Sequence, residues 1–280
     1  MSPIIIAIIL SAALLHAVWN AIVKTAADRT TMLGLVALGQ VLPAMVMIVV
    51  LPLPNMQSMP YIAISTVVHW GYYYFLGRAY AHGDLGVVYP IARGVVPALV
   101  SLWAFLLLNE VLPAPVWGGI ALIVTGIILS NWRALRSGVG ATALVLSLCT
   151  GMCISVYSVV DGIGVRLSGD TLSYWAWGAF LHLFIAGFAG WKRRDVLAQL
   201  PVRVWAIGLT GGIVSMIAYG LVLYAKNFAP LGAVSALRET SVIFATLIGY
   251  FLLKEGNLAR RLTAAVLMAV GIALIGLSAA

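Results

Sequence analysis

Apolar runs of about 20 residues recur along the whole 280-residue sequence. A helix of this length crosses a bilayer, and in lipid every backbone N–H and C=O group needs a partner within the protein, which leaves helix bundles and closed barrels. The runs are continuous rather than alternating with polar residues, so they indicate helices. Only 9% of the residues are charged, against roughly 25% in soluble domains. The sequence therefore predicts an all-α integral membrane protein.

Turn and charge signals divide the chain into ten predicted transmembrane helices. They cover residues 3–23, 32–52, 60–80, 85–107, 113–131, 141–164, 172–191, 203–225, 231–253 and 260–278. The stretches between them are short, so we expect a single membrane domain with no soluble module. The first run lacks a basic segment before it, which favours a first transmembrane helix over a secretory signal.

The chain also contains an internal repeat. When "LLNE" is placed on "LLKE", Arg93 falls on Arg238. This correspondence predicts two homologous halves, residues 1–135 and 138–280, with five spans each. Because five is odd, the halves must have opposite orientations in the membrane, as two inverted five-helix repeats around a central cavity. Inverted repeats of this kind are typical of secondary transporters.

Basic residues are distributed unevenly between the predicted loops. Loops after odd-numbered spans hold twelve Lys and Arg residues, whereas loops after even-numbered spans hold only Arg166 and Lys226. This is the positive-inside pattern, so both termini are expected on the non-cytoplasmic side of a bacterial inner (plasma) membrane. The same loops account for the net charge of +8, so no nucleic-acid partner is expected.

The ten-span plan resembles that of the drug/metabolite transporter superfamily, in its EamA-type branch. So does the phrase that ends each half, a helix closing on "LLxE" followed by a span with "xxGI". The resemblance covers the whole chain, and the Trp- and Tyr-rich spans are similar to those of YddG-type exporters of aromatic and other amino acids. It implies a single-polypeptide transporter with a central cavity lined mainly by spans one, three, four, six, eight and nine, and we expect a monomer. The four-span multidrug relatives use a glutamate in their first span, which this chain lacks, so their proton-exchange mechanism is in doubt here.

Two arginines lie deep inside predicted spans, where charge is costly. Arg93 is about 12 Å along its helix axis. Its guanidinium is expected either to bind a substrate carboxylate or to pair with backbone carbonyls or a buried acid. Pro90 and Pro97 flank it and are expected to kink the helix as a hinge. Arg238 and Glu239 point about 100° apart on a helix, so at least one should meet the cavity or another helix.

Polar and aromatic side chains form stripes on two of the spans expected to line the cavity. His16, Trp19 and Asn20 share one face of the first span, and a histidine with two tyrosines repeats the device in the third. Such residues either bond across helices or bind substrate, and the two stripes together favour binding. The predicted substrate-binding residues are His16, Trp19, Asn20, His69, Tyr72, Tyr73, Tyr89, Arg93, Tyr157, Tyr219, Arg238 and Glu239.

Other residues are expected to have structural roles, and neither a metal nor a cofactor is expected. Cys149 and Cys153 lie one turn apart and suit apolar packing, Glu110 suits a helix end, and Trp175 suits an interfacial anchor. If transport is coupled to protons, the candidate carriers are His16, His69, Glu239 and Asp161.

The function we predict is export of amino acids by alternating access. An amino acid would present apolar surface to the aromatic rings and its charged ends to Arg and Glu. Another small metabolite or a drug is the second candidate, and the absence of a P-loop excludes ATP as the direct energy source. An intramembrane enzyme is a remote alternative, since neither a "GxSx" loop with a partnered histidine nor paired membrane aspartates occur. A retinal-binding receptor would need a mid-helix lysine, and all four lysines lie near span ends.

Overall fold

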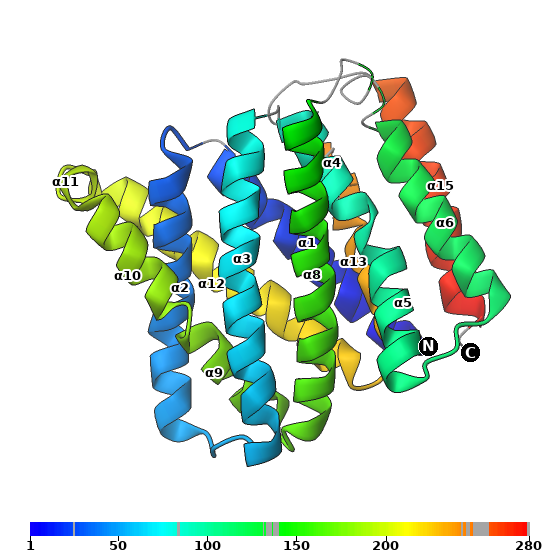
Figure 1. The fold of residues 1–280 in the computed structure, drawn as a ribbon, viewed down its shortest axis with the longest axis horizontal. Coiled ribbons are helices and arrows are strands. Elements are labelled where there is room, and N and C mark those ends of the chain that lie inside the picture. The colour runs from blue at the N-terminus through cyan, green and yellow to red at the C-terminus, as the bar shows by residue number, and fades with distance from the viewer. Residues whose placement is uncertain are drawn as a thin grey trace.

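The computed structural model consists of α-helices that lie side by side (Figure 1). It describes residues 1–24, 26–82, 85–130, 132, 136, 140–241, 243, 244, 247, 248 and 258–278, and no strand occurs among them. Six of the described helices are long and apolar enough to cross a membrane. The prediction of an all-helical, multi-pass membrane protein is confirmed at this level.

Many helix boundaries lie near those of the predicted spans, although the division into ten single helices stays a prediction. Up to residue 130 they are α1 (Pro3–Lys24), α2 (Arg29–Val50), the 3-10 helix η1 (Met56–Ser58), α3 (Met59–His82), α4 (Leu85–Gly94), α5 (Val96–Leu108) and α6 (Ala114–Ser130). From residue 141 they are α8 (Ala141–Leu167), α9 (Thr171–Phe180), α10 (Leu183–Lys192), α11 (Arg194–Leu197), α12 (Val202–Lys226), α13 (Leu231–Arg238) and α15 (Leu258–Ser278).

Three predicted spans are interrupted rather than single helices. The span predicted over 85–107 breaks at Val95 into α4 and α5. Pro97 explains this break, because it has no N–H to donate to the carbonyl of Arg93. The span over 172–191 breaks between α9 and α10. The span over 231–253 starts as α13, which ends at Arg238.

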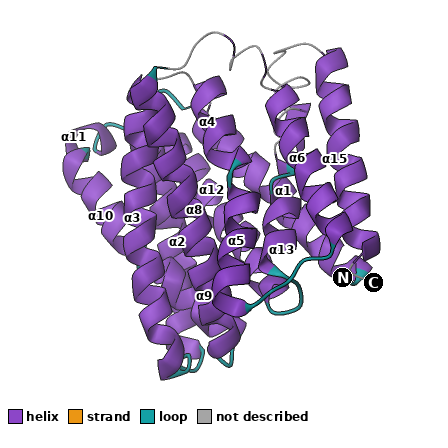
Figure 2. Ribbon diagram, turned by 45° about the vertical axis from the view of Figure 1, so that its right-hand side comes forward, coloured by secondary structure: helices purple, strands orange, loops and turns teal. Residues whose placement is uncertain are grey.

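Helix pairs from distant parts of the chain build the bundle. α1 packs against α12, α3 against α8, and α6 against α15. Figures 1 and 2 both show the α6–α15 pair along one edge, with the two termini close together at one end. Large apolar side chains on the outer faces are exposed, among them Val46, Val49, Leu106, Phe184 and Trp191. Exposed apolar surface of this extent suits contact with lipid.

A capped turn holds the loop between α1 and α2. The Asp28 carboxylate accepts from the N–H groups of Thr30 and Thr31, and it pairs with Arg193 Nε at 3.4 Å. Burial works against its charge, but the bonds from Thr31 and Thr30 and the Arg193 charge outweigh burial. The pKa of the Asp28 carboxyl therefore lies below its ordinary value.

Two glycines let the backbones of α2 and α12 touch. A Cβ on Gly39 would collide with the backbone of Leu209, and a Cβ on Gly212 would lie 2.6 Å from the Cα atom of Gly39. Small residues at such positions are what permits close helix association in membranes.

Gly212→Ala is therefore expected to destabilise the protein by about 1–3 kcal/mol, because the new methyl group forces the two backbones apart. Thermal unfolding in detergent measures the change. Gly77→Ala in α3 is the control, since a Cβ there meets no atom within 4 Å. Equal melting temperatures for Gly212→Ala and wild type would contradict the close packing.

Candidate functional site

Both intramembrane arginines lie in the last turn of a short helix. Arg93 is in the last turn of α4, and Arg238 is the last residue of α13. Carbonyl groups in a last turn lack helical partners, and the C-terminal end of a helix favours positive charge. Helices that break inside a membrane commonly place binding groups at the break.

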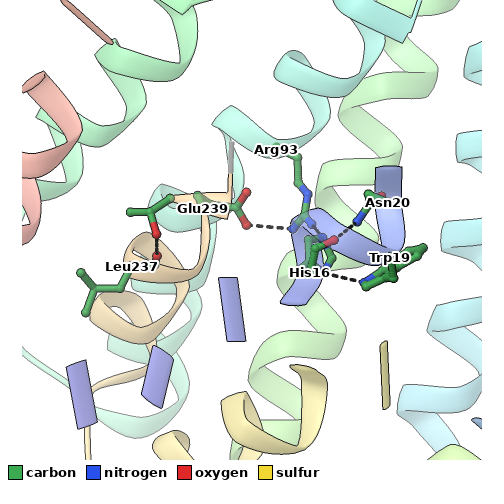
Figure 3. A network of polar contacts seen from close by, with 7 residues as sticks. His16, Trp19, Asn20, Arg93, Leu237 and Glu239 are labelled. Carbon is green, nitrogen blue, oxygen red and sulfur yellow. Dashed lines mark hydrogen bonds and ion pairs between the residues drawn. The ribbon is translucent and has the colours of Figure 1, made fainter. Parts of the chain in front are cut away.

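Arg93 connects three segments of the bundle, as Figure 3 shows. Its Nη1 donates to Glu239 Oε1 at 2.9 Å, and its Nη2 contacts Nε2 of His16. All three residues are buried, Glu239 to within 1% exposure. At this depth each charge has lost its water, and the partner's charge replaces part of that hydration. Of the two expectations for Arg93, this contact corresponds to pairing with a buried acid.

His16 has a donor on each side of its ring. Trp19 Nε1–H faces His16 Nδ1 at 3.2 Å, while the Arg93 guanidinium faces Nε2 (Figure 3). A neutral imidazole accepts at one nitrogen and donates at the other, so it cannot accept from both donors at once. Asn20 Nδ2 donates to the His16 carbonyl at 2.7 Å. The bond between His16 and Arg93 is thus in competition with the bond to Trp19.

Arg238 has a different environment. Its guanidinium lies 5.3 Å from the centre of the Tyr219 ring, and the residue is 8% exposed. Within the described chain, no carboxylate lies within ion-pair distance of it. Its positive charge interacts electrostatically with His16 and Glu239. Arg238 is therefore a buried cation that lies over an aromatic ring and has no ion-pair partner among the residues described.

Two buried polar atoms just after Arg238 have no hydrogen-bond partner among the described residues. They are Glu239 Oε2 and Ser241 Oγ, and both residues are 1% exposed. Buried polar atoms nearly always have a partner, and a missing one calls for an explanation such as a functional role or a bound water or ion. The break after α13 thus offers a cation and two open acceptors close together in sequence.

Several predicted aromatic residues form one cluster between α3, α8 and α12. The His69 ring stacks on Tyr157 at 3.9 Å between centroids and meets Tyr219 edge-on at 6.2 Å. Tyr157 also meets Tyr219 at 6.3 Å and Tyr72 at 6.1 Å, and Tyr73 adjoins Tyr72. Because the Arg238 guanidinium lies over the ring of Tyr219, the aromatic cluster and the arginine are neighbours.

A cavity opens beside this cluster. Its volume is about 40 Å³, which is enough to hold water. The lining includes Gln40, His69, Asp161, Trp175, His182 and Tyr219.

Asp161 is the acid of this cavity. Tyr174 O–H donates to its Oδ1 at 2.9 Å and Tyr219 O–H donates to Oδ2, while Asp161 is 3% exposed. Lys226 lies on the same side of the bundle, where its Nζ donates to the Ser158 carbonyl at 2.9 Å.

Some cavity residues were absent from the predicted set. His182 lies in the turn between α9 and α10, and Trp175 lines the cavity although its place near a span end suggested an interfacial anchor. Gln40 donates to Ser215 Oγ at 3.2 Å. The available signal was polarity itself, since Gln40 and His182 interrupt otherwise apolar runs.

Three further residues with predicted roles in binding or as a hinge lie in the predicted fourth span. Tyr89 and Pro90 belong to α4, but their side chains lie outside the described part of the structure. Pro97 lies in the first turn of α5, next to the break at Val95. The structure thus places Pro97 at a helix break, and its role as a hinge stays a prediction.

A clamp of hydrogen bonds holds the end of the bundle where both termini lie, at the bottom of Figure 1. Arg166 Nη1 donates to Glu110 Oε1 at 2.7 Å, and its other nitrogens donate to the carbonyls of Lys226 and Ala229. Glu110 Oε2 accepts from the Leu231 N–H at 2.9 Å. The clamp therefore joins the ends of α5, α8 and α12 to the start of α13.

Within the described residues, no group of three His, Cys, Asp or Glu side chains is placed to hold a metal ion. Cys149 and Cys153 are free thiols in α8.

Comparisons with known proteins agree with this arrangement of helices. Residues 141–277 match the EamA-like transporter family. A crystal structure of another protein superposes with a TM-score of 0.75 at 16% identity, covering 98% of each chain, which shows a shared fold. A search of curated proteins found no match. Residues 141–277 are thus similar to the EamA-like transporter family, and this similarity points to a membrane transporter of the drug/metabolite type.

The Arg93–Glu239 pair makes a stability prediction. Arg93→Met leaves a buried, uncompensated carboxylate and is expected to cost about 3–5 kcal/mol, whereas Arg93→Met combined with Glu239→Met recovers most of that loss. Unfolding in mixed detergent micelles measures both variants. Asp195→Ala is the control, because the Arg194–Asp195 pair is exposed and should contribute at most about 1 kcal/mol. Additive losses in the double variant would contradict the pairing.

Proposed function

We propose that the chain is a secondary transporter that exports amino acids by alternating access of two inverted five-helix repeats. The helix pairing supports this plan, since α1 packs on α12 just as α8 packs on α3. Under the repeat, α1 corresponds to α8 and α3 corresponds to α12, so each pair is the image of the other. The family match over 141–277 spans nearly all of the second predicted repeat.

The observation that carries the substrate class is the pair of unused groups at the α13 break. Arg238 has no carboxylate partner and Glu239 Oε2 has no donor among the described residues. An α-amino acid supplies both, because its carboxylate fits a guanidinium and its ammonium group fits a carboxylate oxygen. Arg93 then serves to hold Glu239 and to offset its charge. Its contested bond to His16 allows it to change partners during transport.

The surroundings of Arg238 favour substrates with apolar or aromatic side chains. Tyr219 lies under its guanidinium, and Tyr157, His69 and Tyr72 continue the aromatic surface. Rings of this kind pack against flat apolar groups and leave their polar tips for hydrogen bonds. The remaining predicted residues Trp19, Asn20 and Tyr73 complete the proposed wall, with Tyr89 as a further candidate.

Counterflow in liposomes tests the function and the site together. Purified protein should exchange labelled aromatic and aliphatic amino acids in a saturable, mutually competitive manner. Arg238→Ala should raise KM by about 30-fold, the equivalent of about 2 kcal/mol. The KM of Arg238→Lys should lie between those of wild type and Arg238→Ala.

Arg78→Ala is the control for the loss of one positive charge, because Arg78 is exposed near the end of α3 and its removal should leave KM unchanged. Exchange by wild type with a normal KM in Arg238→Ala would refute the proposed carboxylate site. If no amino acid exchanges at all, the amino-acid proposal fails, and another small metabolite or a drug takes its place.

We further propose that the Glu110–Arg166 clamp closes one end of the substrate pathway. Substrate release past this end requires α13 to separate from α8, and the clamp joins both. Under alternating access the clamp must open once in each cycle.

Cross-linking tests the gate. The variant combines Glu110→Cys and Arg166→Cys with Cys149→Ser and Cys153→Ser. A short bifunctional thiol reagent is expected to stop amino-acid counterflow, while a monofunctional reagent of the same chemistry leaves it running. Full exchange by the cross-linked protein would show that the clamp stays closed throughout transport.

A further inference from the structure

The cavity around Asp161 is separate from the unused groups of Arg238 and Glu239. Its volume of about 40 Å³ accommodates water. Its mostly apolar lining includes the titratable side chains of Asp161, His69 and His182 and the hydroxyls of Ser65, Thr66 and Tyr219. Carboxylate and imidazole groups are those that bind protons in membrane proteins.

The two histidines of the cavity have ring nitrogens available. His69 Nδ1 lies 2.8 Å from the Ser65 carbonyl, which can only accept, so this nitrogen carries the hydrogen and leaves Nε2 as the acceptor. His182 meets His69 edge-on at 5.6 Å, and its Nδ1 is buried without a partner among the described residues. The cavity thus places open imidazole nitrogens in the same water-sized space as a buried carboxylate.

Charged and titratable groups face Asp161 from several packed helices. Tyr174 comes from α9, Tyr219 and Lys226 from α12, and His69 from α3. On α13, Arg238 lies over the Tyr219 ring. The remaining charges near α8 are engaged elsewhere: Arg93 of α4 contacts Glu239 and His16, and Arg166 of α8 itself contacts Glu110.

Tyr219 connects this cavity to the proposed substrate site. Its hydroxyl donates to Asp161, and its ring carries the Arg238 guanidinium at 5.3 Å. An ionised Asp161 accepts from both tyrosines, whereas a protonated one has a hydrogen to donate, so one of these bonds can reverse its direction. A change of protonation at Asp161 therefore changes the hydrogen bonds that position Tyr219, whose ring lies under Arg238.

We propose that Asp161 is the proton-binding site of this transporter and that Tyr219 couples it to the amino-acid site. The proposal rests on the proposed amino-acid transport. One proton from water binds the Asp161 carboxylate on one side of the membrane and returns to water on the other, while one zwitterion moves in the opposite direction. The zwitterion carries no net charge, so each cycle moves one positive charge with the proton.

Proteoliposomes with an imposed pH gradient test the coupling. At one-to-one exchange, with the membrane potential held at zero, a gradient of one pH unit should drive about tenfold accumulation of the amino acid, and pyranine in the lumen should report proton flow only when substrate is added. Asp161→Asn should lose both signals but retain counterflow, which needs no net proton movement. Asp170→Asn is the matched control, because Asp170 caps α9 at the same end of α8 and an amide oxygen can still cap.

The outcomes separate the two proposals. If wild-type protein shows no counterflow, the proposed function fails. If counterflow is present but wild type neither accumulates substrate nor moves protons, or if Asp161→Asn still does both, the proton site is refuted. Loss of counterflow in a folded Asp161→Asn protein would also refute it, because Asp161 would then belong to the substrate site. Tyr174→Phe provides the second variant, since it removes the other tyrosine donor to Asp161 outside the proposed substrate site, and it should retain counterflow with weakened accumulation.

Discussion

The ion pair between Arg93 and Glu239 is the interaction on which the interior of this protein depends. In a bundle built to lie in lipid, an isolated charge at this depth is costly, and each of the two charges is tolerated because the other is present. The pair also connects separate helices, because it joins α4 to the end of α13, and Arg93 also contacts His16 of α1. Three segments that carry the proposed site thus meet at a single guanidinium.

The interrupted helices explain how polar groups come together in so apolar a chain. A continuous helix satisfies its own backbone and offers only side chains, whereas a break frees backbone groups and redirects the chain. Arg93 and Arg238 both end short helices, and His182 lies at a third break between α9 and α10. The groups proposed to bind substrate and the Asp161 cavity are therefore consequences of backbone geometry as much as of residue type.

Local patterns were sufficient to predict the helices and the buried arginines, because apolar runs and isolated charges can be read within about 20 residues. The same patterns anticipated that His69, Tyr157 and Tyr219 would matter, and the structure brings these three together. Partners could not be predicted in this way. Arg93 meets an acid that lies 146 residues away, and α13 ends at Arg238 within a run that carries no proline or glycine after Gly232 until Gly249. Only tertiary packing determines such contacts.

Helix α13 is fixed at both of its ends by charged side chains from other parts of the chain. Glu110 binds the N–H of Leu231 at its start, and Arg93 binds Glu239 just past its end. The eight residues of α13 are all buried and span about 12 Å, so the helix is a short, rigid link between the two contacts. Thermodynamic coupling is reciprocal. If ligand binding at Glu239 weakens the bond between Glu110 and Leu231, then breaking that bond changes the affinity for the ligand by the same free energy.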